Sequence, residues 1–141
     1  LDRLGRIFPS FEDYLDLMKT APFFKEWTPA LETYYRYEIK KVDCGVQSGI
    51  HPAHIQEERE NLGKVDFSQF YEKISCPVLI LRATDGMVAE DDLLLPQDVV
   101  ETMVQKIPHA RYVDIPGTNH YSIVFEQNEI RDRAIREFLR E

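Results

Sequence analysis

The sequence predicts an α/β protein, in which helices alternate with the strands of a parallel sheet. The segment 77–82, P-V-L-I-L-R, is a continuous apolar run that is too short for a helix and lacks the alternation of a half-exposed strand. Such a run is typical of a parallel strand covered on both faces. A second strand is predicted over 111–115, R-Y-V-D-I, and apolar residues at helical spacing lie between the two and again near the end of the chain. The order strand, helix, strand, helix predicts a parallel βαβα unit over residues 75–141 with a right-handed crossover.

Residues 1–74 have a different character, because their apolar residues are largely aromatic and recur at helical spacing. Ser10 is the expected cap of a first helix, and Thr28 caps a second helix in which Pro29 occupies the first turn. Residues 42–52 are expected to form a glycine-punctuated connection, followed by a short charged helix from Pro52 to Leu62. A further short helix is expected after Asp66.

Residues 75–141 continue with the first predicted strand and a loop that contains A-E-D-D-L-L-L-P. A helix from Pro96 to Pro108 then precedes the second strand, and a terminal helix has one apolar stripe. Two parallel strands buried on both faces do not form a stable sheet alone, so we expect neighbouring strands from another chain or a preceding segment.

Composition excludes several classes of function. The 141 residues include 17 basic and 25 acidic side chains, a net charge of −8, which disfavours nucleic acid and anionic membrane surfaces as partners. The apolar runs are far too short to span a bilayer. No closed set of zinc ligands and no glycine-rich phosphate loop is present, so no metal or cofactor is predicted. Cys44 and Cys76 are expected as buried or half-buried reduced thiols in a cytoplasmic protein.

Two polar residues follow the two predicted strands, and this is where α/β sheets gather their ligands and catalytic groups. Asp85 follows the first strand, and His120 lies in the loop G-T-N-H-Y-S after the second. A carboxylate that orients an imidazole leaves the other ring nitrogen free to take a proton from a nucleophile. An Asp-Gly pair after a strand is also a common turn, and a loop histidine is often simply solvated, so each residue alone carries little weight.

The run I-S-C-P-V-L-I-L-R-A-T-D-G, followed by I-P-H-A-R-Y-V-D-I-P-G-T-N-H-Y and I-R-E-F-L, resembles the C-terminal portion of the α/β-hydrolase family. Residues 1–74, with F-P-S-F-E-D-Y, resemble more loosely the helical cap or lid that this family inserts before its final strands. The resemblance implies a Ser-Asp-His triad in that chain order, with His120 as the base and Asp85 as the acid.

Two features depart from the family pattern. The nucleophile elbow G-x-S-x-G is absent, and the string around Ser48 has the wrong spacing and follows no buried strand. The family's usual G-x-x-D after the strand is replaced by A-T-D-G, which places the acid one residue early. Asp85 is therefore either the triad acid or a turn residue, and the weaker candidates are Glu90, Asp91 and Asp92.

Three hypotheses follow. The first is the lid and base-bearing part of a serine-dependent hydrolase acting on an ester or related acyl bond, inactive alone because the nucleophile is missing. The second is a non-catalytic binding or oligomerisation module on the same scaffold, which associates with a second copy or with the missing N-terminal half through an open sheet edge. A flavodoxin-like ligand domain is the weakest. His51, His54 and His109 are assigned structural roles.

Overall fold

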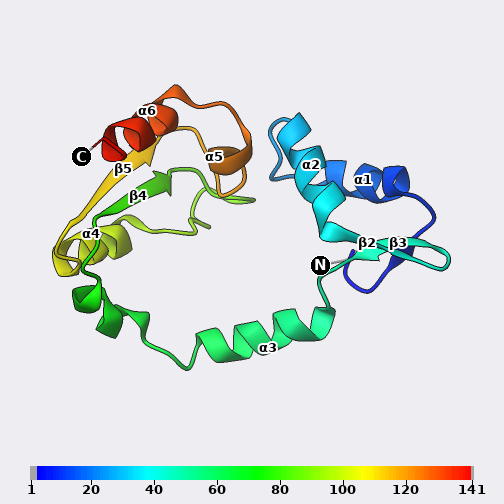
Figure 1. The fold of residues 1–141 in the computed structure, drawn as a ribbon, viewed down its shortest axis with the longest axis horizontal. Coiled ribbons are helices and arrows are strands. Elements are labelled where there is room, and N and C mark those ends of the chain that lie inside the picture. Colours follow the sequence, from blue (N-terminus) through cyan, green and yellow to red (C-terminus); the bar gives the residue numbers. More distant parts are fainter. Residues whose placement is uncertain (1–2, 141) are drawn as a thin grey trace. The chain divides into compact units, whose positions relative to one another are not determined.

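The computed structural model describes residues 3–140, and the chain divides into two compact units, Leu1–Asp66 and Phe67–Glu141. The first unit runs from blue to cyan and green in Figure 1, and the second from green to red. This division falls earlier than the change in sequence character after residue 74. The reason is that the aromatic 3₁₀ helix Phe67–Lys73 packs against a helix of the second unit, α4 (Gln97–Lys106).

The first unit contains helices and a small antiparallel sheet. Its elements, in chain order, are β1 (Ile7–Phe8), α1 (Phe11–Lys19), α2 (Pro29–Glu38), β2 (Ile39–Val42), β3 (Gly45–Ser48) and α3 (Pro52–Leu62).

The predicted starts of the first two helices are confirmed. The Ser10 hydroxyl accepts a hydrogen bond from the Asp13 backbone N–H, and the Thr28 hydroxyl accepts one from the Leu31 N–H. Pro29 takes the first turn of α2, where its missing N–H has no helical partner to lose. Local capping chemistry therefore fixes where both helices begin.

The antiparallel sheet was not predicted, because the glycines of residues 42–52 were interpreted as a loop. In the structure β2 and β3 form a hairpin, and β1 pairs with the other edge of β3. Gly45 is required here, since its φ is +142° and a Cβ at this position would lie 2.0 Å from the Phe8 carbonyl oxygen. The glycine thus permits the close approach of β1 and does not mark an irregular connection.

A buried polar cluster connects the helices of the first unit to its sheet. The Glu38 carboxylate, whose side chain is 6% exposed, accepts hydrogen bonds from the Tyr14 hydroxyl at 3.0 Å and the Ser48 hydroxyl at 2.6 Å. The Arg3 guanidinium pairs with the same carboxylate at 3.0 Å. Burial and the Glu38 charge raise the pKa of the Tyr14 hydroxyl above its usual range, so it stays protonated and serves as a donor.

The second unit has the predicted strand–helix–strand–helix order. Its elements are the 3₁₀ helix Phe67–Lys73, β4 (Val78–Ala83), α4 (Gln97–Lys106), β5 (Ala110–Ile115), α5 (Ser122–Phe125) and α6 (Glu129–Phe138). Strands β4 and β5 are parallel, with Val78 opposite Ala110 and Ala83 opposite Ile115. The α/β class and both strands are confirmed within one residue at each end.

Helices α4 and α6 lie on opposite faces of the two-stranded sheet (Figure 1). On one face, Gln97 of α4 donates a hydrogen bond to the Tyr112 hydroxyl of β5 at 2.8 Å. On the other, the Arg111 guanidinium of β5 lies 5.5 Å from the ring centre of Phe138 in α6. Within residues 3–140 no further strand pairs with β4 or β5.

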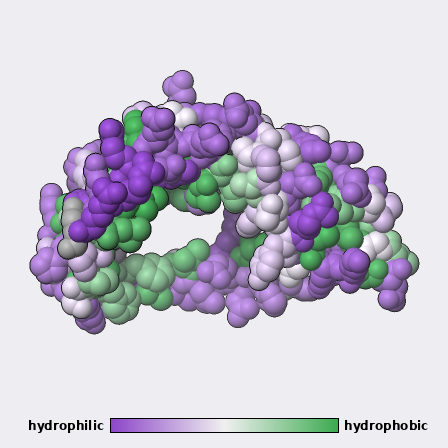
Figure 2. Space-filling view, turned by 45° about the horizontal axis from the view of Figure 1, so that its top comes forward, coloured by the Kyte–Doolittle hydropathy of each residue, from purple (hydrophilic) through white to green (hydrophobic). Residues whose placement is uncertain are grey.

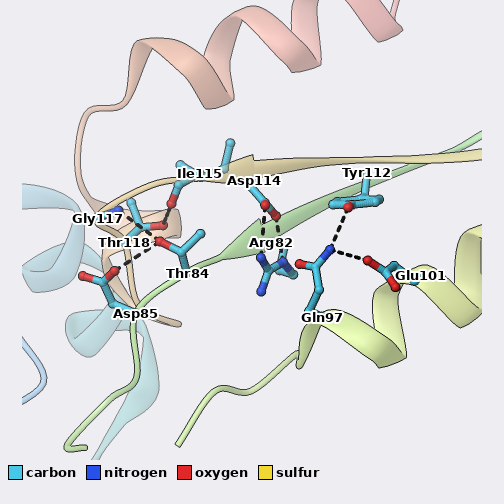
Figure 3. Close-up of polar contacts among 10 residues, drawn as sticks. All are labelled: Arg82, Thr84, Asp85, Gln97, Glu101, Tyr112, Asp114, Ile115, Gly117 and Thr118. Atoms are coloured by element: carbon cyan, nitrogen blue, oxygen red, sulfur yellow. Dashed lines mark hydrogen bonds and ion pairs between the residues drawn. The ribbon is translucent and has the colours of Figure 1, made fainter. Parts of the chain in front are cut away.

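An ion pair joins the two strands on the α4 face. Arg82 of β4 and Asp114 of β5 are register partners, and the guanidinium bonds both carboxylate oxygens, at 2.7 and 3.0 Å (Figure 3). These bonds raise the pKa of the Arg82 guanidinium, whose side chain is 9% exposed. Because residues alternate between faces along a strand, the neighbours of Arg82, Leu81 and Ala83, face the α6 side.

Hydrophobic side chains also reach the surface, where they stand out in green among the purple hydrophilic ones in Figure 2. In the second unit they include Val88, Leu94 and Val124.

Among the helices of the described part of the chain, none has the length and apolar character needed to cross a bilayer.

Candidate active site

The loops that follow β4 and β5 meet at the carboxyl-terminal edge of the sheet. The backbone N–H of Asp85, after β4, donates a 2.8 Å hydrogen bond to the Thr118 carbonyl, after β5. The Gly117 N–H donates to the Thr84 hydroxyl at 3.1 Å (Figure 3). Two bonds between segments more than 30 residues apart therefore hold the acid-bearing loop against the histidine-bearing loop.

The carboxylate of Asp85 is oriented by its neighbour. The Thr84 hydroxyl donates to the Asp85 Oδ1 at 3.1 Å while accepting from Gly117 (Figure 3). A hydroxyl that donates and accepts at once has a fixed proton position, so it defines the direction of the carboxylate it bonds. Two hydrogen bonds of the Thr84 hydroxyl therefore link Gly117, in the loop after β5, to the carboxylate of Asp85.

His120 is exposed and is held by the buried residue before it. Asn119 is only 2% exposed, and its side-chain oxygen accepts hydrogen bonds from the backbone N–H groups of Tyr121 at 3.0 Å and Ser122 at 2.9 Å. The Ser122 hydroxyl accepts in return from the Asn119 N–H at 2.8 Å. These reciprocal bonds close the turn that leads into α5 and leave the His120 ring exposed. The centre of the His120 ring lies 5.4 Å from that of Tyr121, in an edge-on arrangement.

The far end of α5 is held by Arg131 of α6. Its guanidinium donates to the carbonyls of Ile123 at 2.7 Å and Glu126 at 2.8 Å. A cation at a helix C-terminus satisfies carbonyls that have no partner in the helix and complements the helix dipole. The segment after His120 is thereby fixed at both ends.

Asp85 and His120 line one cavity of about 130 Å³ within the second unit. The remaining lining residues are apolar: Leu81, Ala83, Met87, Leu94, Leu95 and Ile123. Sequence analysis predicted that the strand ends would bring the acid and the histidine to one edge of the sheet, and both residues do lie there. The apolar wall around them was not predicted.

A second hollow of about 440 Å³ is lined by residues 84–90, in the loop after β4. The Asp92 carboxylate accepts hydrogen bonds from the backbone N–H groups of Met87 and Val88, and bonds from Val88, Ala89 and Met87 lower the pKa of Asp92. Gly86 is needed for this turn, since a Cβ there would lie 1.7 Å from the Ala89 carbonyl oxygen. The carboxylate of Asp92 is thus engaged in shaping the loop.

Ser48 and His51 make hydrogen bonds that stabilise the fold of the first unit. Ser48 lies in β3 and donates to Glu38, and His51 caps α3 by accepting from the Ala53 N–H at 3.2 Å. No group of three potential metal ligands occurs in residues 3–140.

The expected burial of the two thiols is wrong: Cys44 and Cys76 are both exposed and form no disulfide, because Cys44 lies at the hairpin turn and Cys76 precedes β4.

Four residues that organise the site were missed by sequence analysis: Thr84, Thr118, Asn119 and Arg131. Asn119 has a local signal, because asparagine side chains commonly accept hydrogen bonds from backbone N–H groups two and three residues further along the chain, at turns and helix starts. The other three act across the sheet or between helices, and no local pattern identifies such contacts.

No protein-family model matches the sequence, and no curated protein sequence matches it either. The fold is similar to that in the crystal structure of E-2-(acetamidomethylene)succinate hydrolase, an α/β hydrolase, with a TM-score of 0.72 and 21% sequence identity. The similarity covers 96% of this chain and 47% of the hydrolase chain, so the chain spans about half the length of that enzyme. At this identity the similarity is one of fold.

Proposed function

We propose that this chain is the C-terminal part of a serine-dependent α/β hydrolase that cleaves an ester or related acyl bond. In this proposal residues 75–141 form the βαβα end of the hydrolase core, and residues 1–74 form the cap or lid. The similarity to part of an α/β hydrolase supports it. The single observation that carries it is the cavity shared by Asp85 and His120 at the carboxyl ends of two parallel strands.

His120 acts as the general base in this proposal. With Asp85 fixing the ring, its other nitrogen takes the proton of a serine hydroxyl as that oxygen attacks the acyl carbon. The protonated imidazole then gives the proton to the leaving group, and an acyl-enzyme remains. His120 next deprotonates a water that attacks the acyl-enzyme and releases the acid.

The serine and the oxyanion-hole donors are assigned to polypeptide outside these 141 residues, since the only serine in a G-x-x-S-G string, Ser48, is 3% exposed and bonded to Glu38. The isolated chain is therefore expected to be inactive.

Replacing His120 tests the proposal in the polypeptide that also carries the nucleophile. His120→Ala is expected to lower kcat/KM for p-nitrophenyl esters by about 10³-fold or more, because a general base contributes roughly 10²–10⁴-fold and the nucleophile depends on it. His109→Ala, which changes a histidine in the turn before β5, is the matched control and should leave the rate unchanged. Equal effects of the two variants would exclude His120 as the base.

The same assay identifies the acid. Asp85→Asn is expected to reduce kcat strongly, because an amide favours the wrong histidine tautomer, whereas Asp91→Asn is expected to have little effect. A normal rate for Asp85→Asn would make Asp85 a turn residue and assign the acid to another strand end.

A second candidate function is a non-catalytic association module. The observation that favours it is the two-stranded sheet of the second unit, whose outer edges have no strand partner within residues 3–140. Such edges can pair with a second copy or with the remaining half of the protein. Light scattering on the isolated chain distinguishes these ideas, since a folded monomer would argue against self-pairing.

We also propose that the protein works in the cytoplasm, because two exposed free thiols suit a reducing compartment.

A further inference from the structure

We infer that the cavity beside His120 takes a short, uncharged aliphatic group of the substrate and excludes groups that carry a carboxylate. This inference rests on the proposed function for the identity of the reaction, and it adds the class of substrate. It is carried by three observations: the composition of the cavity wall, the cavity volume, and the charges around it.

The wall of the cavity is apolar apart from the two candidate catalytic residues. Leu81 and Ala83 come from β4, Leu94 and Leu95 from the following loop, and Ile123 from α5. A neutral hydrocarbon group gains free energy by leaving water for such a wall, roughly in proportion to the area it buries. A carboxylate placed against these side chains would lose part of its hydration, and the hydrocarbon wall offers it no hydrogen-bond donor.

The volume of about 130 Å³ limits the size of the group. A cavity of about 150 Å³ can hold a benzene ring, so this space encloses a group of about six non-hydrogen atoms or fewer. A propyl or isopropyl group fits inside this space, whereas a long acyl chain would extend beyond it into solvent.

The loop that borders the cavity carries charges of one sign. Residues 83–105 contain no lysine or arginine, but they include Asp85, Glu90, Asp91 and Asp92 on the loop that borders the site. The nearest cation along the strand, Arg82, lies on the α4 face of the sheet and is bound to both oxygens of Asp114. Arg131, which bonds the backbone carbonyl of the lining residue Ile123, is also engaged with the Glu126 carbonyl and the Asp132 carboxylate. An anionic substrate group would therefore meet the negative charge of the loop and find both of these cations already paired.

Two four-carbon amides test the inference on the intact chain without requiring hydrolysis. Butyramide and succinamate differ in a single terminal group, a methyl in one and a carboxylate in the other, which is ionised at pH 7. Binding is followed by NMR through the ring protons of His120 and the methyl groups of Ile123. Butyramide is expected to bind at least about tenfold more tightly than succinamate, and the difference should shrink at high salt because part of it is repulsion between exposed charges.

A charge substitution sharpens the test. Leu94 is 67% exposed, so Leu94→Arg should fold normally, and it supplies a cation without an acidic partner at the cavity wall. We expect this variant to lose the preference for butyramide or to reverse it. Leu139→Arg is the matched control, because Leu139 is 76% exposed at the end of α6 and does not line the cavity.

The inference is overturned if succinamate binds the unmodified chain as tightly as butyramide, if neither amide shifts the His120 and Ile123 signals, or if the two arginine variants behave alike. Hydrolysis of p-nitrophenyl butyrate and p-nitrophenyl hemisuccinate by the nucleophile-bearing polypeptide separates this inference from the proposed function. Equal hydrolysis of both esters contradicts the inference alone. Binding of butyramide without any hydrolysis contradicts the proposed function alone.

Discussion

The polar cluster of the first unit and the candidate site of the second unit use their polar side chains in opposite ways. In the first unit Tyr14, Glu38 and Ser48 satisfy one another in the interior, where Tyr14 is 0% exposed and Ser48 is 3% exposed. In the second unit Asp85 and His120 are held by backbone bonds around them, and their side chains line a cavity. Polar groups that bond one another stabilise a fold. Polar side chains whose backbone is held in place and which line a cavity are suited to bind and react.

The largest expected effect is on the closed cluster. Glu38→Ala leaves the Arg3 charge and the Tyr14 hydroxyl without their partner, and removing one member of a buried pair costs roughly 3–5 kcal/mol. We expect the first unit to lose about 3 kcal/mol of unfolding free energy. Trp27, the only tryptophan, lies in that unit, so its fluorescence in a urea titration reports the loss.

Glu32→Ala is the control for Glu38→Ala. Glu32 pairs with Arg36 one turn away on α2, but both side chains are about half exposed, and such pairs contribute about 0.5 kcal/mol or less. A similar cost for the two variants would mean that the polar cluster is no more stabilising than a surface pair, and the contrast between the units would fail.

The next effect concerns the support of His120. Asn119→Ala removes the acceptor of the Tyr121 and Ser122 N–H groups, and loss of a helix cap costs about 1 kcal/mol. Amide exchange at Tyr121 and Ser122 is expected to quicken about fivefold, and kcat of the nucleophile-bearing polypeptide is expected to fall while KM changes little. Asn119→Asp, whose carboxylate still accepts both bonds, should restore the rate.

Asn128→Ala separates helix capping from support of the site. Asn128 caps α6 in the same manner, by accepting from the Arg131 N–H at 3.0 Å, so its loss should lower stability to a similar degree. It is expected to lower kcat much less than Asn119→Ala does, because the bonds from the Arg131 side chain to the α5 carbonyls are retained. If both asparagine variants lowered kcat equally, Asn119 would matter only for stability.

The smallest effect is on the loop that Asp92 shapes. Since backbone N–H groups lower the pKa of Asp92 in the folded state, its contribution is present above the unfolded pKa of about 4 and is lost as the pH falls through the folded value. We expect the Met87 and Val88 amides to lose protection from exchange on acidification and, at neutral pH, in Asp92→Ala. Asp91→Ala serves as the control, and equal loss of protection in that variant would contradict the role of Asp92.

Much of the second unit could be predicted because its signals are local. A short apolar run between Pro77 and the turn at residues 84–86 indicates a buried strand, and the helical spacing after Pro96 indicates the helix that returns the chain. The hairpin of the first unit could not be predicted in this way. By local sequence alone Gly45 indicates a loop. Glycine is required there because the Phe8 backbone, from a distant segment of the chain, leaves no space for a Cβ.

The sequence by itself determined the α/β class, the order of elements in the second unit, the starts of the first helices, and the positions of Asp85 and His120 beyond strand ends. These depend on periodicity, caps and chain order, which are properties of neighbouring residues. Only the tertiary structure decided the bonds between the two loops, the support of the histidine loop by Asn119 and Arg131, and the apolar wall of the cavity. Each of these joins residues from different elements, and their mutual positions follow from how the helices and strands pack.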